Sequence, residues 1–242
     1  MYKRQDYGRQ CRDLIHGVLE RYITFFNGGH AAVSWDDARE ISKQFLPFLQ
    51  RYSPELLDEL EGIAEGSGAS FDDLLTLNSR SEAMTLIKRP ASDEEELDGC
   101  SSVAVLPEAM GDGHTLLAQN WDTYSWQEYG TIILQVLRDD GPDLMLVTEA
   151  GQLARYGMNQ AGIALGVNSL HKTFNTKVFG LSLIHIYLLV AQVNEAHPLG
   201  QHRLGSNEKN VDGLFGEHLL QGQAVALYEL DLYPWILRFE RG

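Results

Sequence analysis

Apolar residues in the first third of the chain recur at three- to four-residue spacing, which is typical of amphipathic helices. The first predicted helix covers residues 6–26, and its apolar stripe contains Leu14, Ile15, Val18, Leu19, Tyr22 and Ile23. Ser34, Ser53 and Ser70 each precede a further helical pattern and are predicted to be N-cap residues. We therefore predict helices over most of residues 6–88.

The helical pattern ends before residues 89–98. Pro90 cannot continue a helix, and five acidic residues follow it within 93–98. Like charges this close together repel one another and stay solvated. We predict an exposed linker here.

From residue 100 onwards, short β-branched and apolar runs alternate with turn sequences. Glycine-rich turns at 110–114 and 139–143 separate neighbouring runs and predict hairpins. Helices first and consecutive hairpins afterwards indicate an α+β fold with antiparallel sheet. The predicted strands lie within 101–108, 115–122, 130–139, 144–151, 153–162 and 163–170.

Charge and composition exclude several classes of partner. The 242-residue chain has a formal net charge of -15, from 34 acidic and 19 basic residues, which disfavours nucleic acids and anionic membranes. No apolar run reaches the roughly 18 residues of a membrane-spanning helix, and no signal-peptide pattern opens the chain. The histidines are scattered without metal-ligand spacing, so we predict neither a metal nor a bound organic cofactor. The compartment stays undefined, with the cytoplasm favoured.

Two cysteines, Cys11 and Cys100, are too few for a disulfide framework. Cys100 directly follows Gly99, where the acidic linker meets the first strand. If the Gly99–Cys100 bond is strained, the thiol can attack the Gly99 carbonyl, shift the acyl group from nitrogen to sulfur and free a new N-terminus after hydrolysis. The alternative is a structural cysteine, a small buried residue that cleaves nothing.

A freed Cys100 would combine a nucleophile and a base in one residue. An α-amine titrates at about 7.7–8.0 and a thiol at about 8.5. The amine can therefore accept the proton of its own thiol near neutral pH, without a distant histidine.

Four segments resemble, in matching order, the acyl-coenzyme A:6-aminopenicillanate acyltransferase family, also called the C45 peptidases, among the N-terminal-nucleophile hydrolases. The helical stretch 59–82 is similar to the family's segment before the cleavage site, and DGCSSVAV (98–105) is similar to its processing junction. AQNWD (118–122) matches the strand that carries a catalytic-site aspartate, and 148–170 resembles the segment that ends in an Asn-x-Leu turn. The resemblance covers residues 10–172.

The resemblance implies an αββα sandwich, incomplete at the C-terminus because later family segments cannot be recognised. It implies cleavage between Gly99 and Cys100, with Cys100 as nucleophile, Asp122 orienting its amine or precursor thiol, and Asn168 donating its amide N–H to the oxyanion. Residues 6–99 would become the small subunit, and residues 100–180 would begin the catalytic sheet layers.

Two segments are expected to be foreign to the protein. MYKRQ (1–5) and LSLIHI (181–186) match the two reading directions of a transposon-end adaptor used in shotgun sequencing libraries. We therefore suspect that residues 1–5 and 181–242 are adaptor or chimeric sequence and that the native N-terminus is missing. The alternative is that LSLIHIYLLV (181–190) is an ordinary buried strand.

These inferences predict a self-processing N-terminal-cysteine amidohydrolase or acyltransferase that carries acyl groups as a Cys100 thioester. The acyl donor would be a small-molecule amide or a coenzyme A thioester, the acceptor an amine or water, and the two processed fragments would stay associated. The alternatives are an inactive truncated chimera and an unprocessed protein whose Cys100 is structural.

Overall fold

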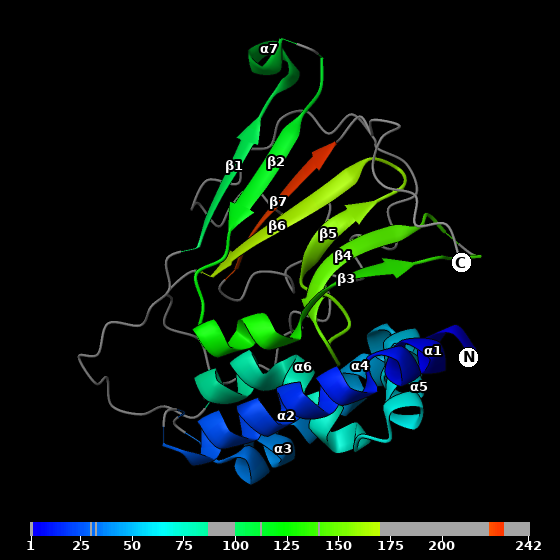
Figure 1. Cartoon of the computed structure of the whole chain (residues 1–242), viewed down its shortest axis with the longest axis vertical. Helices are drawn as coiled ribbons and strands as arrows, with labels where there is room; N and C mark the ends of the chain where they lie inside the picture. The colour runs from blue at the N-terminus through cyan, green and yellow to red at the C-terminus, as the bar shows by residue number, and fades with distance from the viewer. Residues whose placement is uncertain are drawn as a thin grey trace.

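The helices of residues 2–86 gather on one side of the computed structural model and the strands on the other (Figure 1). The structure describes residues 2–29, 31, 33–86, 100–111, 113–139, 141–169 and 223–229. The predicted linker 89–98, Gly99 and the adaptor-like stretch 181–186 lie outside these residues. In the described part, the helices of residues 2–86 precede the strands and all strand pairs are antiparallel, so the α+β prediction is confirmed.

The first predicted helix is divided into two. At Cys11 the backbone has φ -103° and ψ 14°, outside the α-helical region, and a helix ends on each side of it. Residues 2–5 form the first turn of the earlier helix. This helix does not test whether MYKRQ is adaptor sequence, which stays a prediction. The helices are α1 (Tyr2–Gln10), α2 (Arg12–Asn27), α3 (Trp35–Lys43), α4 (Leu46–Tyr52), α5 (Pro54–Ser67) and α6 (Phe71–Leu86).

Local signals account for most of these helix ends. Ser34 caps α3 as predicted, because its hydroxyl accepts a hydrogen bond from the backbone N–H of Asp37 at 3.2 Å. Ser53 precedes α5 with Pro54 at the first position, but its hydroxyl bonds Glu55 instead of a backbone N–H. Gly68 ends α5 at φ 74°, a left-handed conformation that glycine adopts without steric cost.

Helices α1 and α5 approach closely because glycines face each other. A Cβ atom at Gly8 would collide with the carbonyl of Ile63, and one at Gly66 would collide with the carbonyl of Gln5. The close approach lets Tyr7 reach the sheet, where its hydroxyl donates to the carbonyl of Gln152 at 3.2 Å.

The strands of the described residues form two sheets. A hairpin of β1 (Ser101–Val105) and β2 (Leu116–Asn120) makes the smaller one, and a short helix, α7 (Pro107–Met110), lies in its connection. A 3₁₀ helix, η1 (Ser125–Gly130), leads into the larger sheet. That sheet has five strands in sequential order: β3 (Thr131–Val136), β4 (Leu144–Glu149), β5 (Tyr156–Asn159), β6 (Ile163–Ser169) and β7 (Gln223–Glu229).

Strand β7 comes from the part of the chain that the sequence suggested to be chimeric. It pairs with β6 along seven residues, from Ile163 opposite Glu229 to Ser169 opposite Gln223. The pairing shows how the backbone of 223–229 lies beside β6. It does not test whether this segment is chimeric, which stays a prediction.

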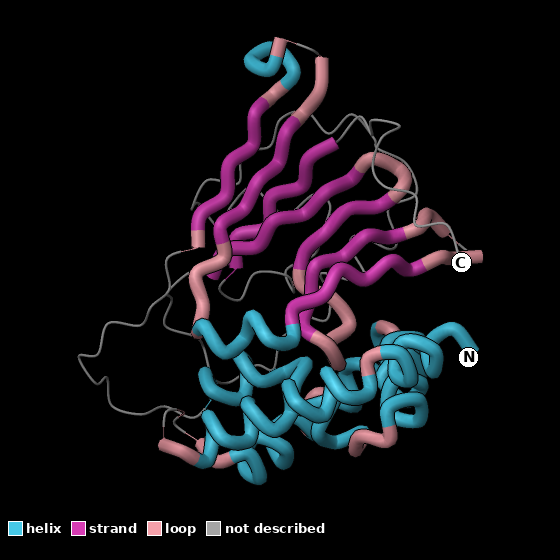
Figure 2. The backbone as a smooth tube through the Cα atoms, viewed as in Figure 1, coloured by secondary structure: helices cyan, strands magenta, loops and turns pink. Residues whose placement is uncertain are grey.

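The core joins the helices to the base of the larger sheet. Figure 2 shows helices and strands as separate regions that meet along one boundary. Leu144, Leu146 and Leu153 are almost fully buried there, together with Leu74 and Leu77 of α6. The hairpin lies apart from this core, and β1 and β2 contact β6 instead. This docking brings the predicted site residues together.

Candidate active site

Cys100 lies at the start of the hairpin, one residue before β1. The register pairs Ser101 with Asn120, so continuing it by one residue places Cys100 opposite Trp121. The thiol is free and partly buried, and it donates a hydrogen bond to the backbone carbonyl of Asp122 at 3.9 Å. The structure therefore brings Cys100 and Asp122 into contact across the hairpin, whereas Gly99 lies outside the described residues.

Asp122 contacts the thiol through its main chain. Its carboxylate is exposed and accepts a hydrogen bond from the side-chain amide of Asn120 at 2.6 Å. Asn120 thus holds the carboxylate of Asp122, the second residue after β2.

Asn168 lies on β6, the strand against which the hairpin packs. Its side-chain oxygen accepts a hydrogen bond from the hydroxyl of Ser102 at 2.9 Å. Ser102 is two residues after Cys100, and side chains at this spacing lie on the same face of a strand. The structure therefore brings Cys100, Asp122 and Asn168 to one end of the hairpin.

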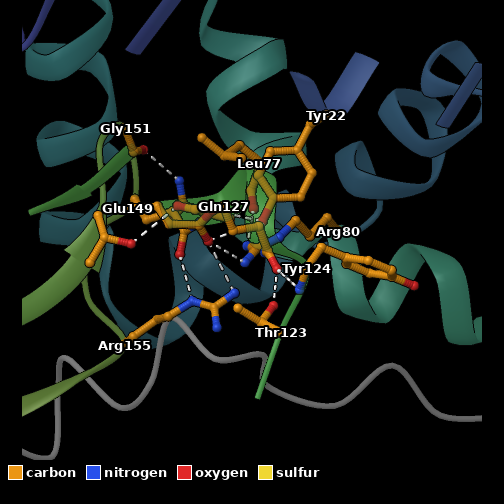
Figure 3. Close-up of polar contacts among 12 residues, drawn as sticks. Tyr22, Leu77, Arg80, Thr123, Tyr124, Gln127, Glu149, Gly151 and Arg155 are labelled. Atoms are coloured by element: carbon orange, nitrogen blue, oxygen red, sulfur yellow. Dashed lines mark hydrogen bonds and ion pairs between the residues drawn. The ribbon is translucent and has the colours of Figure 1, made fainter. Parts of the chain in front are cut away.

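The carboxylate of Glu149 is the centre of a buried polar cluster (Figure 3). Glu149 is 0% exposed and ends β4. A buried carboxylate is stable only when its charge is paired and its oxygens accept hydrogen bonds. The partners are Tyr22 (2.9 and 3.0 Å), Arg80 (3.0 Å), Gln152 (2.7 Å) and Arg155 (3.1 Å).

Two chains of contacts connect Glu149 to the residues on either side of Asp122. On one side, Arg155 places its guanidinium 4.3 Å from the ring centroid of Trp121, a cation–π contact. On the other side, Tyr22 accepts a hydrogen bond from Gln127, whose side-chain oxygen accepts one from the hydroxyl of Thr123. The buried cluster therefore fixes both neighbours of Asp122.

Burial and charge also shift the pKa values of Tyr156, Tyr22 and Arg80. Burial raises the pKa of Tyr156 to about 12, and the charges of Glu149 and Cys100 add to the shift, so its hydroxyl stays neutral at ordinary pH. Burial likewise raises the pKa of Tyr22 well above its usual value. Burial alone would lower the pKa of Arg80, but Tyr22 and Glu149 more than offset it, and the net direction is upward.

Local sequence carried little sign of this cluster. Glu149 is the one detectable member, because a carboxylate ends an otherwise apolar run, LMLVTE, that predicts a buried strand. Tyr22 was predicted only as part of an apolar helix stripe. Arg80, Gln127 and Arg155 have no local signal, since only the folded chain brings them together.

The described residues offer no group of three or more His, Cys, Asp or Glu side chains placed to hold a metal ion. Among the helices of the described part, none combines the length and the apolar character needed to cross a membrane.

Comparison with known proteins finds a distant relative among the acyltransferases. No family model matches the chain. The 40 kDa form of acyl-coenzyme A:6-aminopenicillanic-acid-acyltransferase from Emericella nidulans is 26% identical over 159 residues, which is 64% of this chain. The chain covers 42% of the length of that relative. The chain is therefore a distant relative of the 6-aminopenicillanic-acid acyltransferases.

Proposed function

We propose that the protein is a self-processing N-terminal-cysteine enzyme that transfers or hydrolyses acyl groups through a thioester on Cys100. The observation that carries this proposal is the position of the thiol. Cys100 begins the hairpin, its sulfur contacts the carbonyl of Asp122, and Ser102 on the same strand contacts Asn168. A nucleophile, a carboxylate and an amide donor at one strand end form the minimum set for acyl transfer.

Self-cleavage would proceed in two steps. The Cys100 thiol attacks the carbonyl carbon of Gly99, the C–N bond breaks, and the released α-amine of Cys100 takes up the proton. Water then hydrolyses the thioester, which leaves a carboxylate on Gly99 and a free thiol on Cys100. The exposed carboxylate of Asp122, which accepts a hydrogen bond from Asn120, would favour the ammonium form of the new terminus.

Turnover would use the same thiol. The α-amine accepts the thiol proton, and the thiolate attacks the carbonyl of an amide or of a coenzyme A thioester. Asn168 donates to the resulting oxyanion, and the amine or thiol leaves with the proton. A second amine or water then takes the acyl group from the sulfur. The relative is an acyltransferase by name, which supports acyl transfer as the reaction class.

The proposed fold is the αββα sandwich of N-terminal-nucleophile hydrolases. Helices α1–α6 would form one outer layer, and the two antiparallel sheets would form the inner layers. The contact of β1 and β2 with β6 supports this arrangement. The second helical layer of such a sandwich is not among the described residues.

The cleaved fragments are proposed to stay together through the buried cluster. Tyr22 and Arg80 precede the cleavage site, whereas Glu149 follows it, and all three are buried and bonded to one another. Separation of the fragments would leave a buried carboxylate without two of its partners, which is strongly unfavourable.

Intact-mass measurement of the purified protein tests the proposal. We expect two fragments whose masses sum to that of the chain plus one water, and a single uncut chain for Cys100→Ala. Cys11→Ala is the matched control and should cleave normally, because Cys11 lies in the helical part away from the hairpin. An uncut parent chain would instead favour the alternatives, a structural Cys100 or an inactive chimera.

A further inference from the structure

The side-chain amide of Gln119 holds the hairpin on β6. It bonds the backbone of β6 at a position that β5 does not reach. Pairing between β5 and β6 covers Gly157 with Leu165 and Met158 with Ala164, and does not extend to Val167. There the side chain of Gln119 accepts from the N–H of Val167 at 2.9 Å and donates to its carbonyl. One side chain thus satisfies both backbone groups of Val167 and fixes the position of β2 on β6.

The neighbouring glycine allows the close contact. A Cβ atom at Gly166 would lie 3.1 Å from the side-chain oxygen of Gln119 and 3.4 Å from the hydroxyl of Ser102. Ser102 pairs with Gln119 across the hairpin, so their side chains share the face that meets β6. The position of Ser102 is therefore set by the docking.

We propose that Ser102 is a positioning residue that orients the amide of Asn168 for catalysis. Its hydroxyl donates to the side-chain oxygen of Asn168 at 2.9 Å. An amide held by its oxygen directs its N–H donors away from that bond, where they can meet an oxyanion. Without Ser102 the amide can turn and present its oxygen, which would repel the negative charge. The inference rests on the proposed function, because it assigns Asn168 to the oxyanion of the Cys100 reaction.

Two probes separate oxyanion stabilisation from thiol reactivity. A β-lactone is attacked at its carbonyl by the Cys100 thiolate, the acyl C–O bond of the ring breaks, and the alkoxide takes a proton from the Cys100 ammonium. This reaction passes through an oxyanion. Iodoacetamide is attacked at carbon with loss of iodide, so it forms no oxyanion. Both rates can be measured by mass on the self-cleaved full chain in a Cys11→Ala background.

We expect Ser102→Ala to slow β-lactone acylation about tenfold, the usual effect of losing one orienting hydrogen bond, and to leave alkylation unchanged. Asn168→Ala should slow acylation about a hundredfold. Adding Ser102→Ala to Asn168→Ala should cause no further loss, because Ser102 acts through Asn168. Ser102→Thr should restore the rate, since it keeps the hydroxyl. Ser101→Ala, on the opposite face of β1, is the matched control.

Each other outcome overturns the inference. If Ser102→Ala were acylated by the β-lactone as fast as the parent, Ser102 would have no orienting role. If Ser102→Ala slowed the lactone and the iodoacetamide reactions equally, Ser102 would act on the thiol instead. If the losses in acylation rate were additive in the double variant, Ser102 would act independently of Asn168. If a variant stops self-cleavage, the same comparison applies to that step: loss in Ser102→Ala with normal cleavage in Asn168→Ala overturns the inference. A parent that neither cleaves nor reacts with the lactone contradicts the proposed function itself.

Discussion

Arg155 forms an ion pair of 3.1 Å with Glu149 and at the same time lies over the ring of Trp121, with its guanidinium carbon 4.3 Å from the ring centroid. Glu149 is fully buried, whereas Trp121 adjoins Asp122 at the candidate site. Arg155 therefore links the buried carboxylate of Glu149 to Trp121, the residue next to the proposed catalytic aspartate.

Replacing Arg155 by methionine should lower activity more than stability. Methionine keeps the aliphatic contact but removes the charge that pairs with Glu149 and faces Trp121. Since Glu149 retains Arg80, Tyr22 and Gln152, we expect the chain to fold. The acylation rate with a β-lactone should fall about tenfold, in line with a cation–π contact of about 1–2 kcal/mol.

Arg12→Met is the matched control for that comparison, because Arg12 bonds the carbonyl of Gly66 in the helical part at 3.1 Å. Arg155→Lys should recover part of the rate. If Arg155→Met reacted as fast as the parent, Arg155 would have no role in positioning Trp121 and Asp122.

Arg80→Ala should be strongly destabilising. Arg80 is 3% exposed, and it bonds both Glu149 and the carbonyl of Leu77. Removing one partner from a buried ion pair costs about 3–5 kcal/mol, and the remaining partners of Glu149 should keep the loss near the lower figure. The free energy of unfolding in urea measures this loss.

The exposed pair of Lys43 and Glu40, at 2.7 Å, provides the comparison. Lys43→Ala should change the free energy of unfolding far less than Arg80→Ala does, because solvent screens an exposed pair. Similar losses in Arg80→Ala and Lys43→Ala would show that the buried cluster contributes no more than a surface contact.

Stability should decrease in alkaline solution partly through Tyr156. Burial raises its pKa to about 12 in the folded chain, whereas an unfolded tyrosine titrates near 10. Below about pH 10 both states hold the proton, so this contribution is fully present. Between about pH 10 and pH 12 the unfolded state ionises first, and the free energy of unfolding falls. Tyr156→Phe should show a smaller drop in urea midpoint between about pH 9 and pH 11 than the parent, and equal drops would contradict the assignment.

Sequence predicted those parts of the fold that depend on neighbouring residues. The cap at Ser34 and the β-branched, apolar run within 130–139 are local signals, and the structure contains both the capped helix α3 and the strand β3. The break at Cys11 has no comparable signal, so the two helices beside it were predicted as one. The contact of Cys100 with Asp122 follows from hairpin register, which alternation and turn position also largely define.

The buried cluster could not be predicted in this way. Tyr22, Arg80, Gln127 and Arg155 come from α2, α6, η1 and the loop before β5, and each satisfies Glu149 directly or through a partner. Their selection depends on how helices pack on the sheet, which hydrophobic periodicity does not specify. The amide of Gln119 is a similar case, because its partner Val167 is 48 residues away.

The most direct measurement of the central claim is N-terminal sequencing of the purified full chain, combined with its intact mass over time. We expect the uncut mass to disappear as two masses appear, and the larger fragment to begin with Cys100, Ser101 and Ser102. A chain that keeps its full mass, or one that is cut at a different bond with Cys100→Ala cut equally well, would contradict it.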